Sequence, residues 1–117
     1  MPPFAFAFIF HEIGHYFGGH LANMSLLEIE NSKRSDYVRK GTVEPDELFA
    51  DSFSAYFLGA KCVKKALTDL MLQRKAFDCY YGALDTEESR LAQREYQLRI
   101  KAIDHPNKDL LAKIKNT

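Results

Sequence analysis

The sequence predicts a mainly helical protein that forms one domain. Its 117 residues lie within the usual size of a single domain. Apolar residues recur at helical spacing in several segments, and proline, glycine and helix-capping residues separate these segments. We expect only one short strand, at residues 26–29, so helices should make up most of the fold.

The first helix is expected over residues 4–22. Phenylalanine occupies every second position at the start of this segment, and that alternation alone favours a strand. However, Pro3 suits the first position of a helix, and helical spacing places Phe4, Phe8 and Glu12 on one face. We therefore predict a helix rather than a strand.

The middle of the chain, residues 23–43, is polar and mixed in character. We expect a short strand at 26–29 and a surface loop at 32–41. Proline and acidic residues at 44–47 then mark the start of a helix, because both suit the first turn. Gly59 should end this second helix.

The rest of the chain should contain three further helices. Residues 61–77 form an amphipathic pattern with one apolar stripe, and a turn region follows at 78–84. Either Asp85, together with Glu88, or Thr86 should cap the next helix, which is expected to run to Ile103. Pro106 breaks it, and a short helix is expected at 108–115.

Residues 11–15 read His-Glu-Ile-Gly-His and match the pattern H-E-x-x-H. His11 and His15 are four residues apart, so on a helix they project from the same face and can hold one zinc ion. Glu12 lies beside His11 and would point toward the open side of the metal, where it can take a proton from zinc-bound water. The pattern predicts a zinc site with Glu12 as its general base.

Zinc needs a third protein ligand, with water in its fourth position. His20 is one candidate, but the elongated motif H-E-x-x-H-x-x-G-x-x-H requires histidine at position 21, where this chain has Leu21. A shift of one residue moves a side chain by about 100° around a helix. His20 therefore fits the third position poorly.

Glu47 is the other candidate, and Asp51 lies four residues after it on the same helical face. Asp51 is surrounded in sequence by apolar residues, and a carboxylate on so apolar a helix needs a partner. We expect Asp51 to accept a hydrogen bond from the distal ring nitrogen of a ligand histidine, which would fix the tautomer of that ring. We therefore favour Glu47 over His20 as the third ligand.

Two stretches of the chain resemble the gluzincin zinc peptidases. In that group a helix with H-E-x-x-H is followed by a helix with E-x-x-x-D, a pattern that residues 11–20 (HEIGHYFGGH) and 47–55 (ELFADSFSA) match. The residues in these two stretches are similar to those of the HtpX and CAAX-protease group and of its small soluble relatives, the minigluzincins. The resemblance covers residues 8–67 well and residues 104–114, with their His-Pro pair, weakly. The ImmA/IrrE-like metallopeptidases share much of these sequence motifs and are the nearest alternative family.

The resemblance implies a zincin-like helical core, in which an active-site helix packs beside a glutamate helix. It also implies a zinc endopeptidase that acts on peptides or unfolded protein segments. His11, His15 and Glu47 would bind the metal. Glu12 would act as general base and acid, and Asp51 would orient a ligand histidine. The alternative is a zinc-binding interaction or regulatory module with weak or no catalytic activity.

The oxyanion in such a site usually has a second donor besides the metal. The resemblance of the His-Pro segment favours His105 for this role, although a loop histidine before proline also has a purely structural explanation. Three tyrosines are the other candidates, namely Tyr56, Tyr80 and Tyr81.

The chain departs from the gluzincin pattern before its first motif. Gluzincins place a small β-sheet there, and its edge strand holds the substrate, whereas only ten residues precede His11 here. We expect this sheet to be reduced or missing in a single zincin-like domain, residues 1–117, that is either truncated or naturally short. The phenylalanines of the first helix would then be exposed to solvent. We therefore expect a homo-oligomer that forms through this helix. A compact monomer that folds these rings inside is the alternative.

Composition narrows the partners and the compartment. Sixteen basic and sixteen acidic residues cancel, so no net field favours nucleic acid or an anionic membrane. The longest apolar run, residues 2–10, is about half the length that a membrane span requires. Cys62 and Cys79 are too few for a secreted disulfide framework and favour a cytoplasmic protein with reduced thiols.

Overall fold

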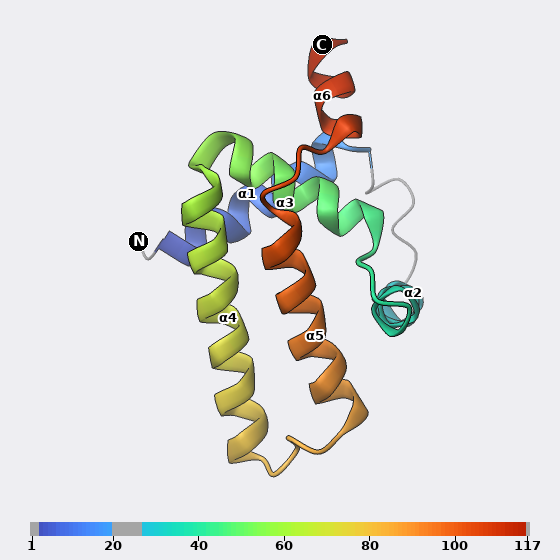
Figure 1. Ribbon diagram of the computed structural model, residues 1–117, viewed down its shortest axis with the longest axis vertical. Helices are drawn as coiled ribbons and strands as arrows, with labels where there is room; N and C mark the ends of the chain where they lie inside the picture. The colour runs from blue at the N-terminus through green and yellow to red at the C-terminus, as the bar shows by residue number, and fades with distance from the viewer. Residues whose placement is uncertain (1–2, 20–26, 117) are drawn as a thin grey trace.

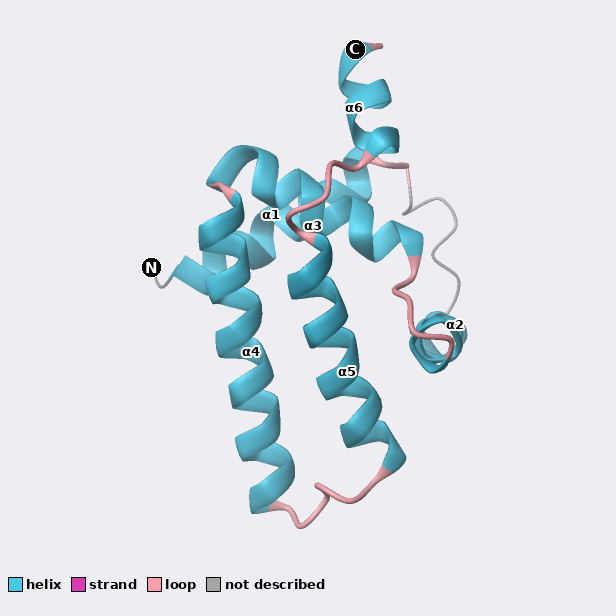
Figure 2. Cartoon of the chain, viewed as in Figure 1, coloured by secondary structure: helices cyan, strands magenta, loops and turns pink. Residues whose placement is uncertain are grey.

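The computed structural model describes residues 3–19 and 27–116, and within these ranges the chain forms six α-helices and no strand (Figures 1 and 2). The helices are α1 (Pro3–Phe17), α2 (Leu27–Arg39), α3 (Pro45–Leu58), α4 (Ala60–Tyr80), α5 (Glu87–Ala102) and α6 (Lys108–Lys115). α4 and α5 run side by side, α1 packs across α3 and α4, and α2 packs against α5. The prediction of a mainly helical fold is confirmed over the described residues.

α3 begins and ends where its sequence predicts. The carboxylate of Glu44 accepts a hydrogen bond from the backbone N–H of Glu47 at 3.3 Å, and Pro45 occupies the first turn. Gly59 ends the helix with a φ of 89°, a conformation that only glycine adopts without a steric penalty. The chain turns there directly into α4, so the helix that carries Glu47 is fixed at both ends.

The hairpin of α4 and α5 also follows its predicted signals. The hydroxyl of Thr86 caps α5 by accepting a hydrogen bond from the backbone N–H of Ser89 at 3.2 Å. α4 continues past its predicted end to Tyr80. Buried Asp78 stabilises this last turn, since it accepts hydrogen bonds from Arg74 at 2.8 Å and from the Ser89 hydroxyl at 2.7 Å. The turn between the two helices therefore covers residues 81–86 rather than the predicted 78–84.

Two predictions for the middle of the chain are wrong. The strand expected at 26–29 and the surface loop expected at 32–41 fall largely within α2. Leu26 lies outside the described residues. α1 ends at Phe17, and its predicted end, Ala22, also lies outside the described residues.

Ion pairs attach α2 to the rest of the molecule. Arg34 donates two hydrogen bonds to Glu95 of α5, and Arg39 donates to Glu87 at 2.9 Å. Val38 contributes a buried apolar contact near the end of the helix. Charged contacts between distant segments leave no apolar periodicity in the sequence, which explains why the helical pattern was not visible there.

Two apolar clusters form the interior beneath α1 and between α4 and α5. The buried residues of the first are Phe49, Phe53 and Leu110. Those of the second are Val63, Leu67 and Ile103. α3 contributes to the first cluster and packs Ala55 and Leu58 against the second, so it is the central helix of the fold.

α1 crosses α3 closely at Gly14. A Cβ atom at this position would lie 2.9 Å from the Cα of Ala50 and 2.9 Å from the Cβ of Phe53. Only glycine therefore permits this approach without a shift of the helices. Ser54 adds a polar contact, since its buried hydroxyl donates to the carbonyl of Ala7 at 3.1 Å.

The outer face of α1 is apolar and exposed. Its exposed apolar residues are Phe6, Phe8, Ile9, Ile13 and Tyr16. Phe10 is half-buried and stacks on Phe57 of α3 with ring centroids 5.6 Å apart. The side chain of Phe4 lies outside the described part of the structure. α1 thus carries exposed apolar side chains as predicted, and self-association through them stays a prediction.

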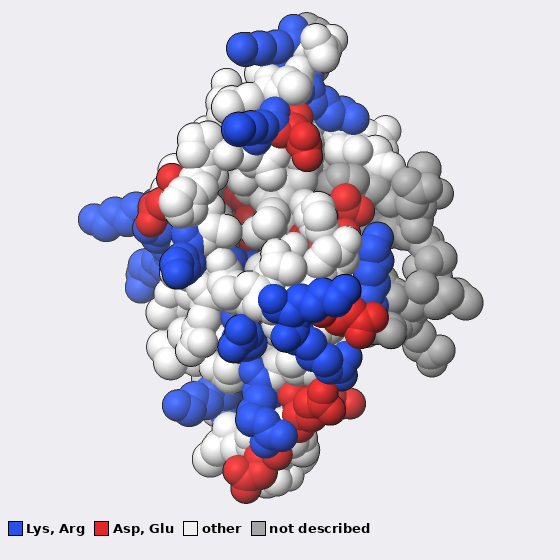
Figure 3. All heavy atoms as spheres, turned by 45° about the vertical axis from the view of Figure 1, so that its right-hand side comes forward, with Lys and Arg blue, Asp and Glu red and all other residues white. Residues whose placement is uncertain are grey.

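The surface carries mixed charge. On the face shown in Figure 3, acidic and basic side chains lie next to one another. Ion pairs between such side chains of the molecule include Lys64 with Asp104 and Arg39 with Glu87. None of the helices within the described ranges combines the length and the apolar character that crossing a bilayer requires.

Candidate metal centre

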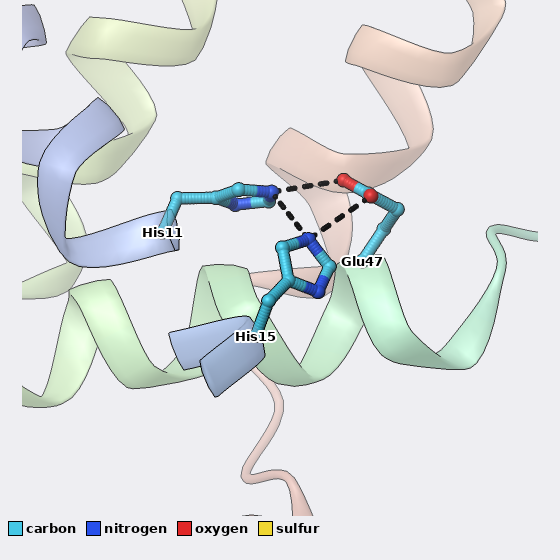
Figure 4. A group of neighbouring side chains, drawn as sticks. All are labelled: His11, His15 and Glu47. Carbon is cyan, nitrogen blue, oxygen red and sulfur yellow. Dashed lines mark hydrogen bonds and ion pairs between the residues drawn. The ribbon is translucent and has the colours of Figure 1, made fainter. Parts of the chain in front are cut away.

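α1 and α3 bring three donor side chains together (Figure 4). His11 Nε2 lies 2.9 Å from Glu47 Oε2, and His15 Nε2 lies 3.1 Å from Glu47 Oε1. The Nε2 atoms of His11 and His15 are 3.1 Å apart. All the donor atoms lie within 4.8 Å of one another, and the three side chains are largely buried. The structure therefore contains a candidate metal site.

The spacing of these atoms fits a small divalent cation. Zinc binds imidazole nitrogen and carboxylate oxygen at about 2.0–2.2 Å, which places tetrahedral ligand atoms roughly 3.3 Å apart. The observed separations of 2.9 to 3.1 Å are close to this spacing. One ion fits after small adjustments of the side chains. Two imidazoles and a carboxylate also suit other transition metals, so the donor set alone does not identify the ion.

Asp51 holds the far side of the His11 ring. His11 Nδ1 donates to Asp51 Oδ1 at 2.8 Å, which leaves His11 Nε2 facing His15 and Glu47. Arg99 of α5 donates to both oxygens of Asp51, from Nε to Oδ2 at 2.7 Å and from Nη2 to Oδ1 at 2.8 Å. The hydrogen bond expected of Asp51 is thus accompanied by a guanidinium that sequence reasoning did not assign.

The carboxylates around His11 favour positive charge at the site. Burial lowers the pKa of His11, but its hydrogen bonds with Asp51 and Glu47 outweigh burial and raise that pKa to about 9. Burial raises the pKa of Glu47, but hydrogen bonds from His11 and His15 outweigh it and hold the pKa well below its usual range. Without metal, the cluster therefore holds a proton between two carboxylates. The same negative surroundings stabilise a bound cation.

A second guanidinium, that of Arg34, approaches the carboxylate of Glu47. Arg34 Nη2 lies 3.9 Å from Glu47 Oε2 and donates to Glu95 Oε1 at 2.5 Å. Glu95 and Arg99 are four residues apart on α5. In a sequence, this spacing is typical of an ion pair on an exposed helix surface. Only the tertiary structure shows that α5 contributes both side chains to the surroundings of the candidate metal centre.

Glu12 is exposed and lines a cavity of about 270 Å³ together with His11 and Glu47. Apolar side chains of α4, including Val63 and Leu70, form part of the remaining wall. A carboxylate in this place can accept a proton from a molecule that enters the cavity. The cavity thus unites the predicted base with two of the predicted ligands.

The remaining candidates lie elsewhere. His20 lies outside the described residues. His105 is exposed in the loop between α5 and α6 and lines a different cavity, together with Asp51 and Arg99. The tyrosines considered for the same role are exposed, namely Tyr56 on α3 and Tyr80 and Tyr81 at the end of α4. The role of His105 as an oxyanion donor stays a prediction.

The described residues contain a buried His-His-Glu cluster, a buried carboxylate–guanidinium pair beside it and an exposed glutamate on the adjoining cavity. This arrangement can hold a divalent cation and place a proton acceptor near it. Compared with protein-family models, with curated proteins and with solved structures, the chain matches none.

Proposed function

We propose that this protein is a zinc-dependent metallopeptidase of the gluzincin type that cleaves within peptides or unfolded protein segments. The observation that carries the proposal is the cluster of His11, His15 and Glu47 with Glu12 on the adjoining cavity. The packing of α1 on α3 supports a zincin-like core, because it brings the H-E-x-x-H and E-x-x-x-D motifs together.

Each side chain has a defined task in this reaction. When bound, zinc would act as a Lewis acid that activates water and polarises the peptide carbonyl. Glu12 would accept the proton of the attacking water and deliver it to the leaving amine. Its exposure at the cavity supports this role, since a general base must reach both water and substrate. Asp51 would keep His11 in the tautomer that leaves Nε2 for the metal.

A zinc-binding module with weak or no catalysis is the second candidate. No strand is present within residues 3–19 and 27–116. Gluzincin peptidases, in contrast, hold the substrate backbone along the edge strand of a small sheet. The three metal ligands all come from helices, so zinc binding does not require such a strand. The two candidates therefore share the metal and differ in peptide cleavage.

The substitution Glu12→Gln distinguishes a zinc peptidase from a zinc-binding module that has weak or no catalytic activity. The purified protein is analysed for bound metals and incubated with unstructured peptides, and the products are read by mass spectrometry. For a peptidase we expect one zinc per chain in both forms and a loss of cleavage by about a hundredfold or more in the variant. Glu88→Gln, which changes an exposed glutamate of α5, is the matched control and should cleave like the wild type.

The other outcomes are equally clear. Zinc in both proteins with cleavage in neither would favour the binding module. Cleavage that survives Glu12→Gln would remove Glu12 from the mechanism. A wild-type protein without bound zinc, even after zinc is added and the excess is dialysed away, would overturn both candidates.

A further inference from the structure

Arg99 reaches the metal centre through Asp51. Its Nε and Nη2 atoms donate to the two carboxylate oxygens of Asp51 at 2.7 and 2.8 Å. Oδ1, which accepts from Arg99, also accepts from His11 Nδ1 at 2.8 Å. One carboxylate oxygen therefore joins the guanidinium to the imidazole, in a chain of contacts that runs from α5 through α3 to α1.

This geometry restrains the Asp51 carboxylate. A carboxylate with a single partner can still rotate about its terminal bond, whereas a bidentate contact fixes both oxygens relative to the planar guanidinium. Arg99 is itself restrained, because it is 7% exposed and its Cζ lies 5.6 Å from the centre of the Tyr96 ring. Oδ1 is consequently held where it accepts the Nδ1 proton of His11.

Arg99 also balances the charge of Asp51. Asp51 is only 3% exposed, and a buried carboxylate without a cation is costly. The guanidinium of Arg99 supplies this cation, because it contacts both carboxylate oxygens of Asp51. With Arg99 beside it, the Asp51 carboxylate is paired with a cation and still accepts the hydrogen bond of His11 Nδ1.

We propose that Arg99 is a positioning residue of the metal centre. By holding Asp51, it fixes the orientation and the tautomer of the His11 ring and directs His11 Nε2 toward the ion. The inference rests on the zinc binding of the proposed function and is independent of peptide cleavage. It goes beyond the predicted ligand set, because Arg99 touches Asp51 rather than a metal ligand.

A double-mutant cycle of Arg99→Lys and Asp51→Asn tests this role. Lysine keeps the positive charge but lacks the planar fork that holds two oxygens. Zinc affinity is measured by competition with a chelator of known affinity. We expect Arg99→Lys to weaken zinc binding about tenfold and Asp51→Asn by about 10- to 100-fold. The double variant should bind within about twofold of Asp51→Asn, because Arg99 acts through Asp51.

A second readout reports the His11 ring directly. Nitrogen-15 NMR of the zinc-loaded wild type should show His11 protonated at Nδ1 and metal-bound at Nε2. In Arg99→Lys we expect faster solvent exchange of the Nδ1 proton, which a merely structural role for Arg99 would not produce. Arg39→Lys is the matched control, since Arg39 is an exposed arginine paired with Glu87 and should leave both readouts unchanged.

Unchanged zinc affinity in Arg99→Lys would overturn the proposal, as would losses that simply add in the double variant. If Arg99→Lys does not fold, the Asp51→Asn, Arg99→Met protein removes both buried charges. Zinc affinity equal to that of Asp51→Asn would then support the proposal, and a further tenfold loss would overturn it. These failures occur in a protein that still binds zinc, whereas a wild type that binds no zinc overturns the proposed function as well.

Discussion

Replacing Gly14 by alanine tests whether the close crossing of α1 and α3 assembles the metal centre. The new Cβ would lie 2.9 Å from both the Cα of Ala50 and the Cβ of Phe53. Carbon atoms pack favourably at about 3.5–4.0 Å, so the helices would have to separate by about 0.5–1 Å. Because one of the contacts is with the backbone, a side-chain rotation cannot relieve it.

The separation acts directly on the ligand spacing. His11 and His15 flank Gly14, so the distances of 2.9 and 3.1 Å to Glu47 would lengthen when α1 moves away. Overpacking costs about 1–3 kcal/mol, and the better helix propensity of alanine offsets about 1 kcal/mol of this. We expect a net loss of about 0–2 kcal/mol in the unfolding free energy of the metal-free protein. Zinc affinity should fall about tenfold, equivalent to about 1.4 kcal/mol.

Urea denaturation in excess chelator measures the first effect, and competition with a chelator measures the second. Ile13→Ala is the control, because Ile13 is the neighbouring residue of α1 and is exposed. It should leave zinc affinity unchanged. If Gly14→Ala binds zinc as tightly as the wild type, the close crossing does not set the spacing of the ligands.

Three further outcomes follow from the structure. Elemental analysis should show loss of zinc in Glu47→Ala and retention in His20→Ala, and the reverse result would assign the third ligand to His20. Light scattering at micromolar concentration should show an oligomer that Ile13→Asp dissociates, because Ile13 lies on the exposed apolar face of α1, and a wild-type monomer would contradict self-association. The hydrogen bond from Ser89 lowers the pKa of Asp78 in the folded protein. The ionised carboxylate therefore stabilises the fold at pH values above the pKa that Asp78 has in the unfolded chain. This stabilisation is lost as the pH falls through the lower pKa of the folded protein. The difference in unfolding free energy between wild type and Asp78→Asn should therefore shrink below about pH 4, and a difference independent of pH would refute this linkage.

Local geometry explains what could be predicted from the sequence. His11 and His15 share a helical face because they are four residues apart, and the same spacing relates Glu47 to Asp51. The limits of α3 depend on residues within or next to it, such as Pro45 at its start and Gly59 at its end. These features are set by contacts within one or two helical turns, so the residue order alone determined them.

Contacts between distant segments were decided only by the tertiary structure. The sequence of α2 has no apolar stripe that would indicate a helix. Its ion pairs with α5 join residues that are far apart in the chain. Arg99 lies 48 positions from Asp51, and nothing in the order of residues indicates which buried carboxylate it would meet. The sequence by itself determined the three donor residues of the candidate metal centre and the two helices that carry them. The packing of α1, α3 and α5 determined that those donors converge and that a buried guanidinium contacts Asp51 beside them, because burial and long-range pairing depend on how whole helices pack.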